Sequence, residues 1–558
     1  MKRFIVIAIF VTLAGLGFRL VLALRFPTDE PDDGRLYARI ATNVLEHRSY
    51  SIDVEEPYAP TFIRVPGYPL FIAGIYKFFG RDNNRAVRIV QAALDTINCW
   101  FIALLAFIWA PAGWSKEKRR RLLLIALCLA ISCPFSAIYV ATILTETCAT
   151  LCISAAVLAA SVAININNSR RSILWWVLSG VCGGIATMLR PDSGVFIAAV
   201  GFTLFLLLVI DLIGSRTARL DAGKQNSALR LTLAKTMASA VALAIGFGVA
   251  LAPWTIRNIR VFGLFQPVSP RHANMPGEFV PIGYIDWLRT WVDDVKYTES
   301  MEFPLDVGPL HIERVPEYAF DSAEEREQVA ALIARYNGIP NTGKVEPTSS
   351  PITSNQQVSE TEKPAVEPPP ATSPEDQDDE DDSEADEEDK DAEAPSAEAA
   401  FSGEMTPEID AAFEEIARAR ISRHPLRYYF FVPLKRAVSL WFDTHSQYYP
   451  FQGELLPLSE LDTDLNQQIW LPLFAFLNVF YTALGLFGAW LMWVNKTSRR
   501  WLLLIAVLII PRLAFLASLE NPEPRYVVEF FGFVLATGSL ALAELWYRLR
   551  GLRWSKTV

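Results

Sequence analysis

Apolar residues follow one another along this chain in about ten long runs, each roughly 17 to 25 residues in length. A helix needs about 20 consecutive apolar residues to cross the hydrocarbon core of a bilayer. The pattern therefore predicts an all-α polytopic membrane protein with about ten transmembrane helices. The predicted spans are 4–24, 88–110, 121–140, 142–164, 172–189, 193–213, 235–254, 468–493, 501–518 and 527–547.

Clusters of Lys and Arg stand in every second connection between these spans. The clearest are Lys118–Arg121, Arg216–Lys235 and Arg548–Lys556. Because cationic loops are retained on the cytoplasmic side of a membrane, this alternation predicts that both termini are cytoplasmic. Residues 25–87 and 255–467 then face outward as two large loops.

The predicted spans divide the chain into three parts. Residues 1–254 form an N-terminal transmembrane module that includes the first outer loop, 25–87. Residues 255–467 form a large outer region, and residues 468–558 form a C-terminal transmembrane module. Within the outer region, 341–402 is rich in Pro, Ser, Asp and Glu and has almost no large apolar residue, which predicts a disordered acidic insertion. An acidic run of this kind either binds cations or basic partners or is a solvated spacer. We favour the spacer and assign the run no chemistry.

The formal net charge of −10 arises in that insertion, because residues 375–393 contain fourteen Asp or Glu and one Lys. The rest of the chain is mildly basic. All six cysteines fall within or at the ends of apolar runs. This distribution argues against a disulfide framework and against a thiolate metal site.

Two short segments of the first outer loop have the pattern of helices that lie at a membrane surface. Between Leu36 and Leu45 the apolar residues recur at helical spacing, which predicts an amphipathic interfacial helix. The segment from Gly67 to Gly80 is apolar but shorter than a span, so we expect a re-entrant or interfacial helix there. If it crossed the membrane, every later loop would change sides.

Asp32 and Asp33 stand at the start of the first of these helices. Asp is favoured at a helix N-terminus, where it caps backbone N–H groups and complements the helix dipole. The alternative is catalysis, because four carboxylates follow a membrane exit and an aromatic and proline cluster, 65–69, lies downstream. The residues alone leave both interpretations open.

Several arginines stand where the charge alternation does not expect them. A cation near the hydrocarbon is costly and usually has a partner or a function. A guanidinium group matches phosphate oxygens in a fork that does not deprotonate, so one function is to bind an anionic head group. The alternatives are contact with lipid phosphates and pairing with Glu146, Asp192, Glu520 or Glu523. The arginines are Arg190, Arg257, Arg260 and Arg525 at outer span ends and Arg512 within a span.

Glu146 is an acid at the start of an apolar run, and it could serve as a base, a metal ligand or the partner of an arginine. The five histidines show no metal-ligand spacing, so no metal site is predicted, although a divalent cation is not excluded as a cofactor. No P-loop, GxGxxG or GxSxG motif is present. Nucleotide-driven and serine-hydrolase chemistry are therefore not expected, and neither is a nucleic-acid partner.

Taken in order along the chain, these motifs resemble the integral-membrane GT-C glycosyltransferases. The similar group is the bacterial glycosyltransferase-family-39-like one, which is related to protein O-mannosyltransferases and the aminoarabinose transferase. The acidic insertion departs from that family's pattern. The resemblance depends on 32–41 (Asp-Asp-Gly-Arg-Leu-Tyr-Ala-Arg-Ile-Ala), Pro66-Gly67-Tyr68-Pro69, Thr145-Glu146, Leu189-Arg190-Pro191-Asp192, 252–258 (Ala-Pro-Trp-Thr-Ile-Arg-Asn), 424–428 (His-Pro-Leu-Arg-Tyr) and Glu523-Pro524-Arg525-Tyr526.

The resemblance implies a sugar donor carried on a polyprenyl phosphate, which suits a chain without a nucleotide site. It also implies a catalytic base in the first outer loop, a role that fits Asp33 best, with Asp32 adjacent. Arg257, Arg525 and Arg190 would stabilise the departing phosphate. Glu146, Tyr37, Asn258 and Tyr526 are candidate supporting residues. A single base predicts inversion at the anomeric carbon.

The implied partners are membrane lipids, the donor and an acceptor hydroxyl on a lipid, a polysaccharide or a protein. The implied location is a bacterial inner membrane. Three alternatives stay open: a transporter or flippase of a lipid-linked or anionic substrate, a non-catalytic membrane scaffold, and a ligase that moves an oligosaccharide from a pyrophosphate carrier.

Overall fold

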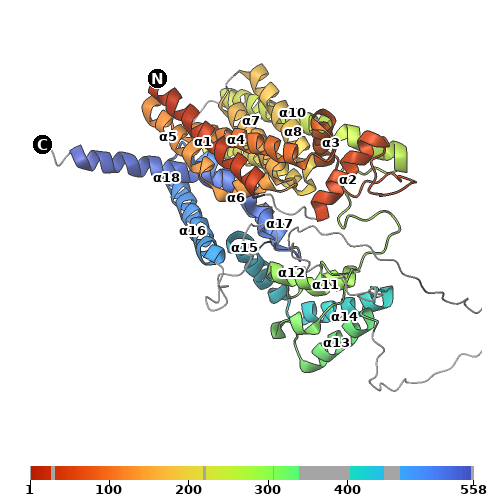
Figure 1. The fold of residues 1–558 in the computed structure, drawn as a ribbon. Helices are drawn as coiled ribbons and strands as arrows, with labels where there is room; N and C mark the ends of the chain where they lie inside the picture. The colour runs from red at the N-terminus through yellow and green to blue at the C-terminus, as the bar shows by residue number, and fades with distance from the viewer. Residues whose placement is uncertain are drawn as a thin grey trace, which may run out of the picture.

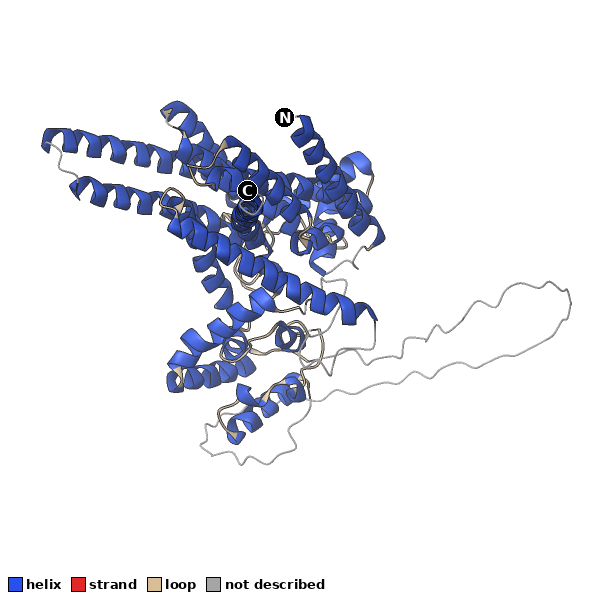
Figure 2. Ribbon diagram, turned by 90° about the vertical axis from the view of Figure 1, so that its left-hand side faces the viewer, coloured by secondary structure: helices blue, strands red, loops and turns tan. Residues whose placement is uncertain are grey.

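The computed structural model of this chain describes residues 2–26, 32–166, 168–217, 222–305, 307–338, 403–444, 446 and 465–554. Within these ranges every regular element is helical, as Figure 2 shows. The all-α prediction is therefore confirmed. The predicted acidic insertion, 341–402, lies outside the described residues.

Nine helices in the described ranges are long and apolar enough to cross a membrane, and a bent pair brings the number to ten. The prediction of about ten spans is confirmed on this count. The nine are α1 (Lys2–Arg25), α4 (Asn84–Trp109), α7 (Glu146–Asn165), α8 (Ser169–Leu189), α9 (Gly194–Thr217), α10 (Ala222–Phe262), α16 (Leu465–Val494), α17 (Arg499–Ala517) and α18 (Val528–Trp554).

The bent pair replaces the straight span predicted at 121–140. Helix α5 (Lys116–Ile131) ends before Pro134, and the short helices α6 (Pro134–Ala137) and η1 (Ile138–Ala141) continue at an angle of 52°. Proline lacks an N–H group and cannot continue the hydrogen-bond ladder, which frees carbonyl groups at the end of α5. Arg19 of α1 donates to two of them, Ile131 O at 3.2 Å and Ala130 O at 3.4 Å. The break is thus satisfied inside the bundle.

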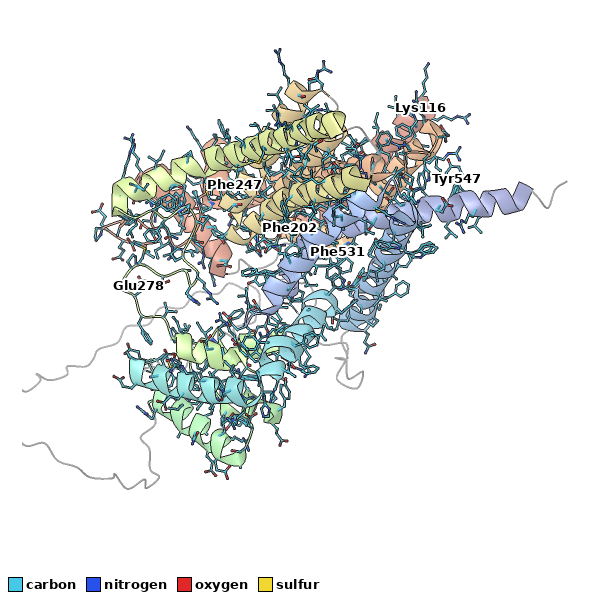
Figure 3. All side chains as sticks on the ribbon, turned by 180° about the vertical axis from the view of Figure 1, so that it is seen from behind. Lys116, Phe202, Phe247, Glu278, Phe531 and Tyr547 are labelled. Atoms are coloured by element: carbon cyan, nitrogen blue, oxygen red, sulfur yellow. The ribbon has the colours of Figure 1, made fainter. Side chains whose placement is uncertain are left out.

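The two ends of the bundle differ in what they carry (Figure 1). Helix α1 begins and α18 ends on the left of that view, whereas α2 (Asp32–Glu46) and α3 (Gly67–Phe79) lie on the right. Figure 3 shows the same division from behind, with Lys116 and Tyr547 at one end and Glu278 at the other. This arrangement agrees with an even number of crossings, and the cytoplasmic side of the bundle stays a prediction.

Helices α2 and α3 confirm the two helices predicted in the first outer loop. At 1.5 Å per residue the 13 residues of α3 extend about 20 Å. The hydrocarbon core of a bilayer is about 30 Å thick, so α3 is too short to cross it.

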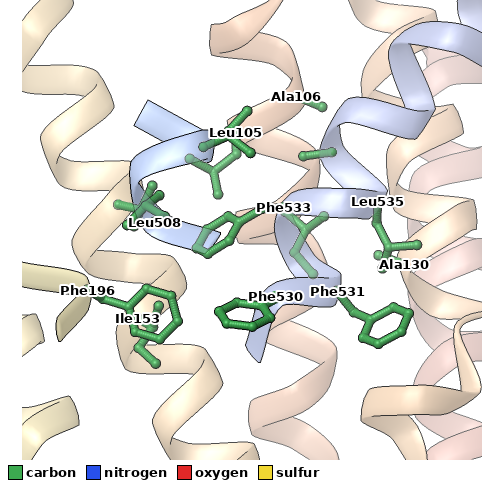
Figure 4. Packing of buried hydrophobic residues seen from close by; sticks show 14 of the residues in the cluster. Leu105, Ala106, Ala130, Ile153, Phe196, Leu508, Phe530, Phe531, Phe533 and Leu535 are labelled. Atoms are coloured by element: carbon green, nitrogen blue, oxygen red, sulfur yellow. The ribbon is translucent and has the colours of Figure 1, made fainter. Parts of the chain in front are cut away.

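The spans pack around the first half of α18. Figure 4 shows Phe530, Phe531 and Phe533 of α18 among apolar side chains of α4, α7, α9 and α17. Helices α8 and α10 approach most closely at glycines: a Cβ added at Gly180 would lie 2.1 Å from Leu243 O. Small residues of this kind let membrane helices pack backbone to backbone.

A second apolar core lies below the bundle in Figure 1. We call the helices around it the outer lobe. They are α11 (Ile282–Arg289), α12 (Val295–Met301), η3 (Ile312–Arg314), η4 (Glu317–Ala319), α13 (Ala323–Tyr336) and α14 (Pro407–Arg423). The π-helix η5 (Arg427–Phe431) and α15 (Val432–Phe442) then connect the outer lobe to the bundle.

Candidate functional site

A cavity of about 210 Å³ opens at the end of the bundle that carries α2 and α3. Segments from the first outer loop, the start of α7, the end of α8, the loop after α10 and the short helix that precedes α18 surround it. Positions far apart in the sequence therefore meet here. Its charged and aromatic lining residues are Asp33, Tyr37, Arg64, Glu146, Arg190, Asp192, Arg271, Arg525 and Tyr526.

Asp33 lies in the first turn of α2, and its carboxylate contacts two arginines. Arg64 Nη2 lies 3.1 Å from Oδ1, and Arg525 Nη2 lies 3.5 Å from Oδ2. Burial alone would raise the pKa of Asp33, but the charges of Arg525 and Arg64 outweigh it and hold this pKa below its ordinary value. The group is thus an ionised carboxylate at neutral pH. The side chain of Asp32 lies outside the described part of the chain.

A buried network of charges forms the inner wall of the cavity. Arg190, which ends α8, donates to Glu146 Oε1 at 2.6 Å and lies 3.4 Å from Asp192 Oδ1 in the short helix η2 (Pro191–Ser193). Behind it, Arg512 of α17 pairs with both Asp192 and Glu529. Two arginines thus face three acids. The charge of Arg190 is already balanced by partners of its own chain.

Two lining groups have polar atoms without a partner among the residues described. Glu146 is 2% exposed, and its Oε2 atom accepts no hydrogen bond in these ranges. Arg271 is exposed in the loop after α10 and forms no hydrogen bond or ion pair with any described residue. The cavity therefore has an unused cation at its rim, and the Glu146 carboxylate in its wall keeps one buried oxygen without a partner among the described residues.

Aromatic rings line the remaining sides of the cavity. The ring of Tyr526 in η7 (Pro524–Val527) lies 5.1 Å from the guanidinium of Arg525 and 5.2 Å from that of Arg190. Tyr37, one turn after Asp33, packs edge-on against Tyr68 with ring centroids 5.3 Å apart. Burial raises the pKa of Tyr37, so its hydroxyl stays neutral.

The outer lobe contacts the loop that follows α17 and leads to Arg525. Arg289 of α11 donates to Glu520 Oε2 at 2.6 Å, and Thr298 of α12 donates to the Glu520 carbonyl at 3.1 Å. Burial, together with the charge of Glu520, raises the pKa of Glu302 to about 8. Burial also raises the pKa of Glu523 to about 7. These contacts therefore hold the segment between α17 and α18 in place. Two buried carboxyl groups beside them, Glu302 and Glu523, have raised pKa values.

Arg257 and Asn258 lie apart from this cavity. Arg257 donates to Thr61 O at 2.8 Å and to Asn258 Oδ1 at 2.9 Å, and its guanidinium lies 4.9 Å from the Trp254 ring. Asn258 donates to Gln266 O at 2.7 Å. Both residues hold loops against the end of α10. Of the residues expected at the site, the structure brings together Asp33, Tyr37, Glu146, Arg190, Arg525 and Tyr526.

Sequence reasoning missed Arg64 and Arg271 as site residues, and it considered Asp192 only as a partner of an arginine. Arg64 follows Thr61-Phe62-Ile63 and precedes Val65-Pro66, so a lone cation inside an apolar and proline-rich stretch was the available signal. No feature of the sequence around Arg271 marked it as a site residue. The described residues contain no group of three or more His, Cys, Asp or Glu side chains placed to hold a metal ion.

This arrangement can bind an anion and, at an adjacent carboxylate, accept a proton. Arg64, Arg525 and Arg271 supply cationic donors at the rim, and guanidinium forks match phosphate oxygens. The Asp33 carboxylate lies between two of them and can accept a proton.

Comparison with known proteins confirms the resemblance expected from the motifs. Residues 60–223 match the family model described as dolichyl-phosphate-mannose-protein mannosyltransferase. The matched segment contains Arg64, Glu146, Arg190 and Asp192, and it ends before Arg525. No curated protein matches the chain by sequence.

Solved structures that are similar to this chain include the following two. The apo oligosaccharyltransferase of Archaeoglobus fulgidus is 11% identical with a TM-score of 0.41, and the alignment covers 98% of this chain. The present chain spans only 52% of the length of that protein. Apo ArnT of Cupriavidus metallidurans is 13% identical with a TM-score of 0.33, and the alignment covers 96% of this chain and 77% of ArnT.

Proposed function

We propose that this protein is a membrane glycosyltransferase that moves a sugar from a polyprenyl-phosphate carrier to an acceptor hydroxyl at the outward face of the membrane. The observation that carries the proposal is the Asp33 carboxylate held between Arg64 and Arg525 at the mouth of a membrane-end cavity. The family match supports it, because the description of that family names a sugar carried on dolichyl phosphate.

The donor phosphate would bind at Arg525, Arg64 and Arg271, with its lipid tail in the bilayer. This assignment replaces Arg257 of the sequence-based expectation with Arg64 and Arg271, because Arg257 does not line the cavity. Arg190 would act indirectly, since its donor atoms already hold Glu146 and Asp192 in place. The sugar would occupy the cavity, next to the carboxylate of Glu146.

In the reaction, the acceptor oxygen forms a bond to the anomeric carbon as the bond from that carbon to the phosphate oxygen breaks. The acceptor proton passes to Asp33, and the bonding electrons leave with the phosphate. General-base catalysis requires the carboxylate to be ionised, which its two arginines ensure. The same arginines, preorganised at the rim, stabilise the charge that develops on the leaving phosphate. One displacement with one base inverts the anomeric configuration.

The test is transfer of labelled sugar from a panel of polyprenyl-phosphate donors by the full chain in proteoliposomes. The Asp33→Asn variant should lose at least about 100-fold in rate, because a positioned general base contributes about 10²–10⁴. Glu55→Gln is the matched control, since Glu55 is exposed in the same loop and does not line the cavity. An NMR assignment of the product anomer tests inversion.

Three outcomes would overturn all or part of the proposal. Equal rates for wild type and Asp33→Asn would move the base to another acid. Counterflow of a labelled solute without any covalent product would favour the transporter alternative, and a phenotype that survives Asp33→Asn but requires the outer region would favour the scaffold.

A further inference from the structure

An apolar stripe runs along the outside of η5 and α15, the two helices that connect the outer lobe to the bundle. It consists of Leu426, Phe430, Leu434, Val438 and Phe442, which are 72, 57, 52, 54 and 41% exposed. Their spacing of four places them along one face of the helix. The opposite face, formed by Val432, Arg436 and Leu440, is almost completely buried, so apolar side chains stand on the exposed face of this segment as well as on the buried one.

This stripe is not a general property of the outer lobe. Helices α13 and α14, which are fully described, expose no large apolar side chain. They present charged residues to the surface, as a helix in contact with water does. A contiguous apolar patch of this kind indicates a specific contact with another apolar phase or molecule.

The contacts of Trp441 give the depth of this helix relative to the spans. Its ring lies 5.9 Å from the rings of Phe530 and Phe531, in the first turn of α18. Its Nε1 atom donates to Thr482 Oγ1 of α16 at 2.8 Å. The end of α15 is thus level with the first turn of α18, on the same side of the bundle as the Asp33 cavity, and it also reaches the middle of α16.

The stripe also continues the apolar surface of a neighbouring span. On α16, Ile469, Trp470 and Phe476 are each more than half exposed, as expected for side chains that face lipid. Between α15 and the outer lobe runs an open groove of about 550 Å³, in which Leu434 and Val438 lie near Lys435 and Asp293. Apolar and charged groups side by side match the boundary between acyl chains and headgroups.

We propose that residues 426–442 lie in the membrane interface, with this stripe inserted at the acyl boundary of the bilayer leaflet next to the Asp33 cavity. The occupant of the stripe is lipid. The insertion fastens the outer lobe to the membrane and keeps its contacts with the Glu520 loop at the depth of the site. This proposal does not depend on the proposed glycosyltransferase activity, and its test requires no turnover.

The test places the photo-crosslinker p-benzoylphenylalanine at Leu434 or Val438 of the full chain in phospholipid vesicles, followed by mass spectrometry of the adducts. Phe476 on α16 is the positive control for lipid contact. Glu327, exposed on α13, is the control for a water-facing position. We expect lipid adducts at Leu434 and Val438 at no less than about a third of the Phe476 yield, and none at Glu327.

Three results would overturn the proposal. Crosslinks to another segment of the chain would mean that the stripe is covered internally. Crosslinks between two copies would make it an interface of an oligomer. Absence of adducts at both stripe positions, with normal labelling at Phe476, would place the stripe in water. Because two stripe positions are tested separately, misfolding of one variant does not decide the outcome.

Discussion

The guanidinium groups of Arg64 and Arg525 meet on the single carboxylate of Asp33. In the proposed reaction a donor phosphate would compete for the same two guanidinium groups. When the phosphate draws them away, the Asp33 carboxylate loses part of its stabilisation and becomes a stronger base at the moment when a base is needed. Donor binding and base activation would therefore be linked through shared arginines.

The pH dependence of activity tests this arrangement. The pKa of Asp33 lies below its ordinary value of about 3.9 because of Arg525 and Arg64, so wild-type activity should fall only under strongly acidic conditions. In Arg525→Gln one opposite charge is gone while burial remains, and the pKa of Asp33 rises. We expect the acid limb of the kcat/KM profile to move to higher pH by about one unit or more.

Arg260→Gln is the control for the pH profile, because this exposed arginine at the end of α10 does not line the cavity and should leave the limb in place. An acid limb that does not move in Arg525→Gln would show that a group other than Asp33 limits the reaction.

At the residue scale, the sequence predicted those residues whose chemistry conflicts with their position. Arg190, Arg525 and Glu146 are charged groups at span ends, and all three line the cavity. Arg257 has the same signature, yet its guanidinium is satisfied by the Thr61 carbonyl and nearby aromatic rings. The sequence could not distinguish these cases, because the partner of each arginine comes from a distant segment.

At the scale of elements, the packing of α3 against α8 depends on Gly67. A Cβ at this position would lie 2.4 Å from Met188 O, next to the end of α8 that bears Arg190. Gly67→Ala should therefore push α3 away from the cavity wall. We expect a loss of about 1–3 kcal/mol in the free energy of unfolding, measured by thermal or denaturant unfolding of the purified protein.

Gly74→Ala is the matched control in the same helix. A Cβ at Gly74 would meet no atom within 4 Å, so only helix propensity changes, and the substitution should stabilise by about 0.5–1 kcal/mol. A similar loss in both variants would mean that helix α3, rather than its contact with Met188, is sensitive to substitution.

The existence of the helices was predictable from apolar run length and helical spacing, as α2, α3 and the spans confirm. The 52° bend at Pro134 was not. A proline among apolar residues is compatible with a mild kink or with a break, and the choice depends on whether another side chain satisfies the freed carbonyls. Here Arg19 does so from a different span.

For the whole molecule, the buried pair of Arg19 and Asp95 joins three helices of the bundle. Arg19 Nε lies 2.6 Å from Asp95 Oδ2 of α4, both side chains are at most 1% exposed, and Arg19 also donates to the end of α5. Asp95→Asn keeps the shape of the side chain but leaves a buried cation without its counter-charge. We expect the free energy of unfolding in detergent or lipid to fall by about 3–5 kcal/mol.

Two further variants separate the charge from the packing. Replacing both partners, as Arg19→Met with Asp95→Leu, removes the unpaired charge and should recover most of the loss. Recovery should be incomplete, because the Ile131 carbonyl at the break after α5 loses its donor. Glu117→Gln breaks the exposed pair with Arg121 and should change the unfolding free energy by no more than about 0.5 kcal/mol. If Asp95→Asn costs as little as Glu117→Gln, the pair does not hold α1 in the bundle.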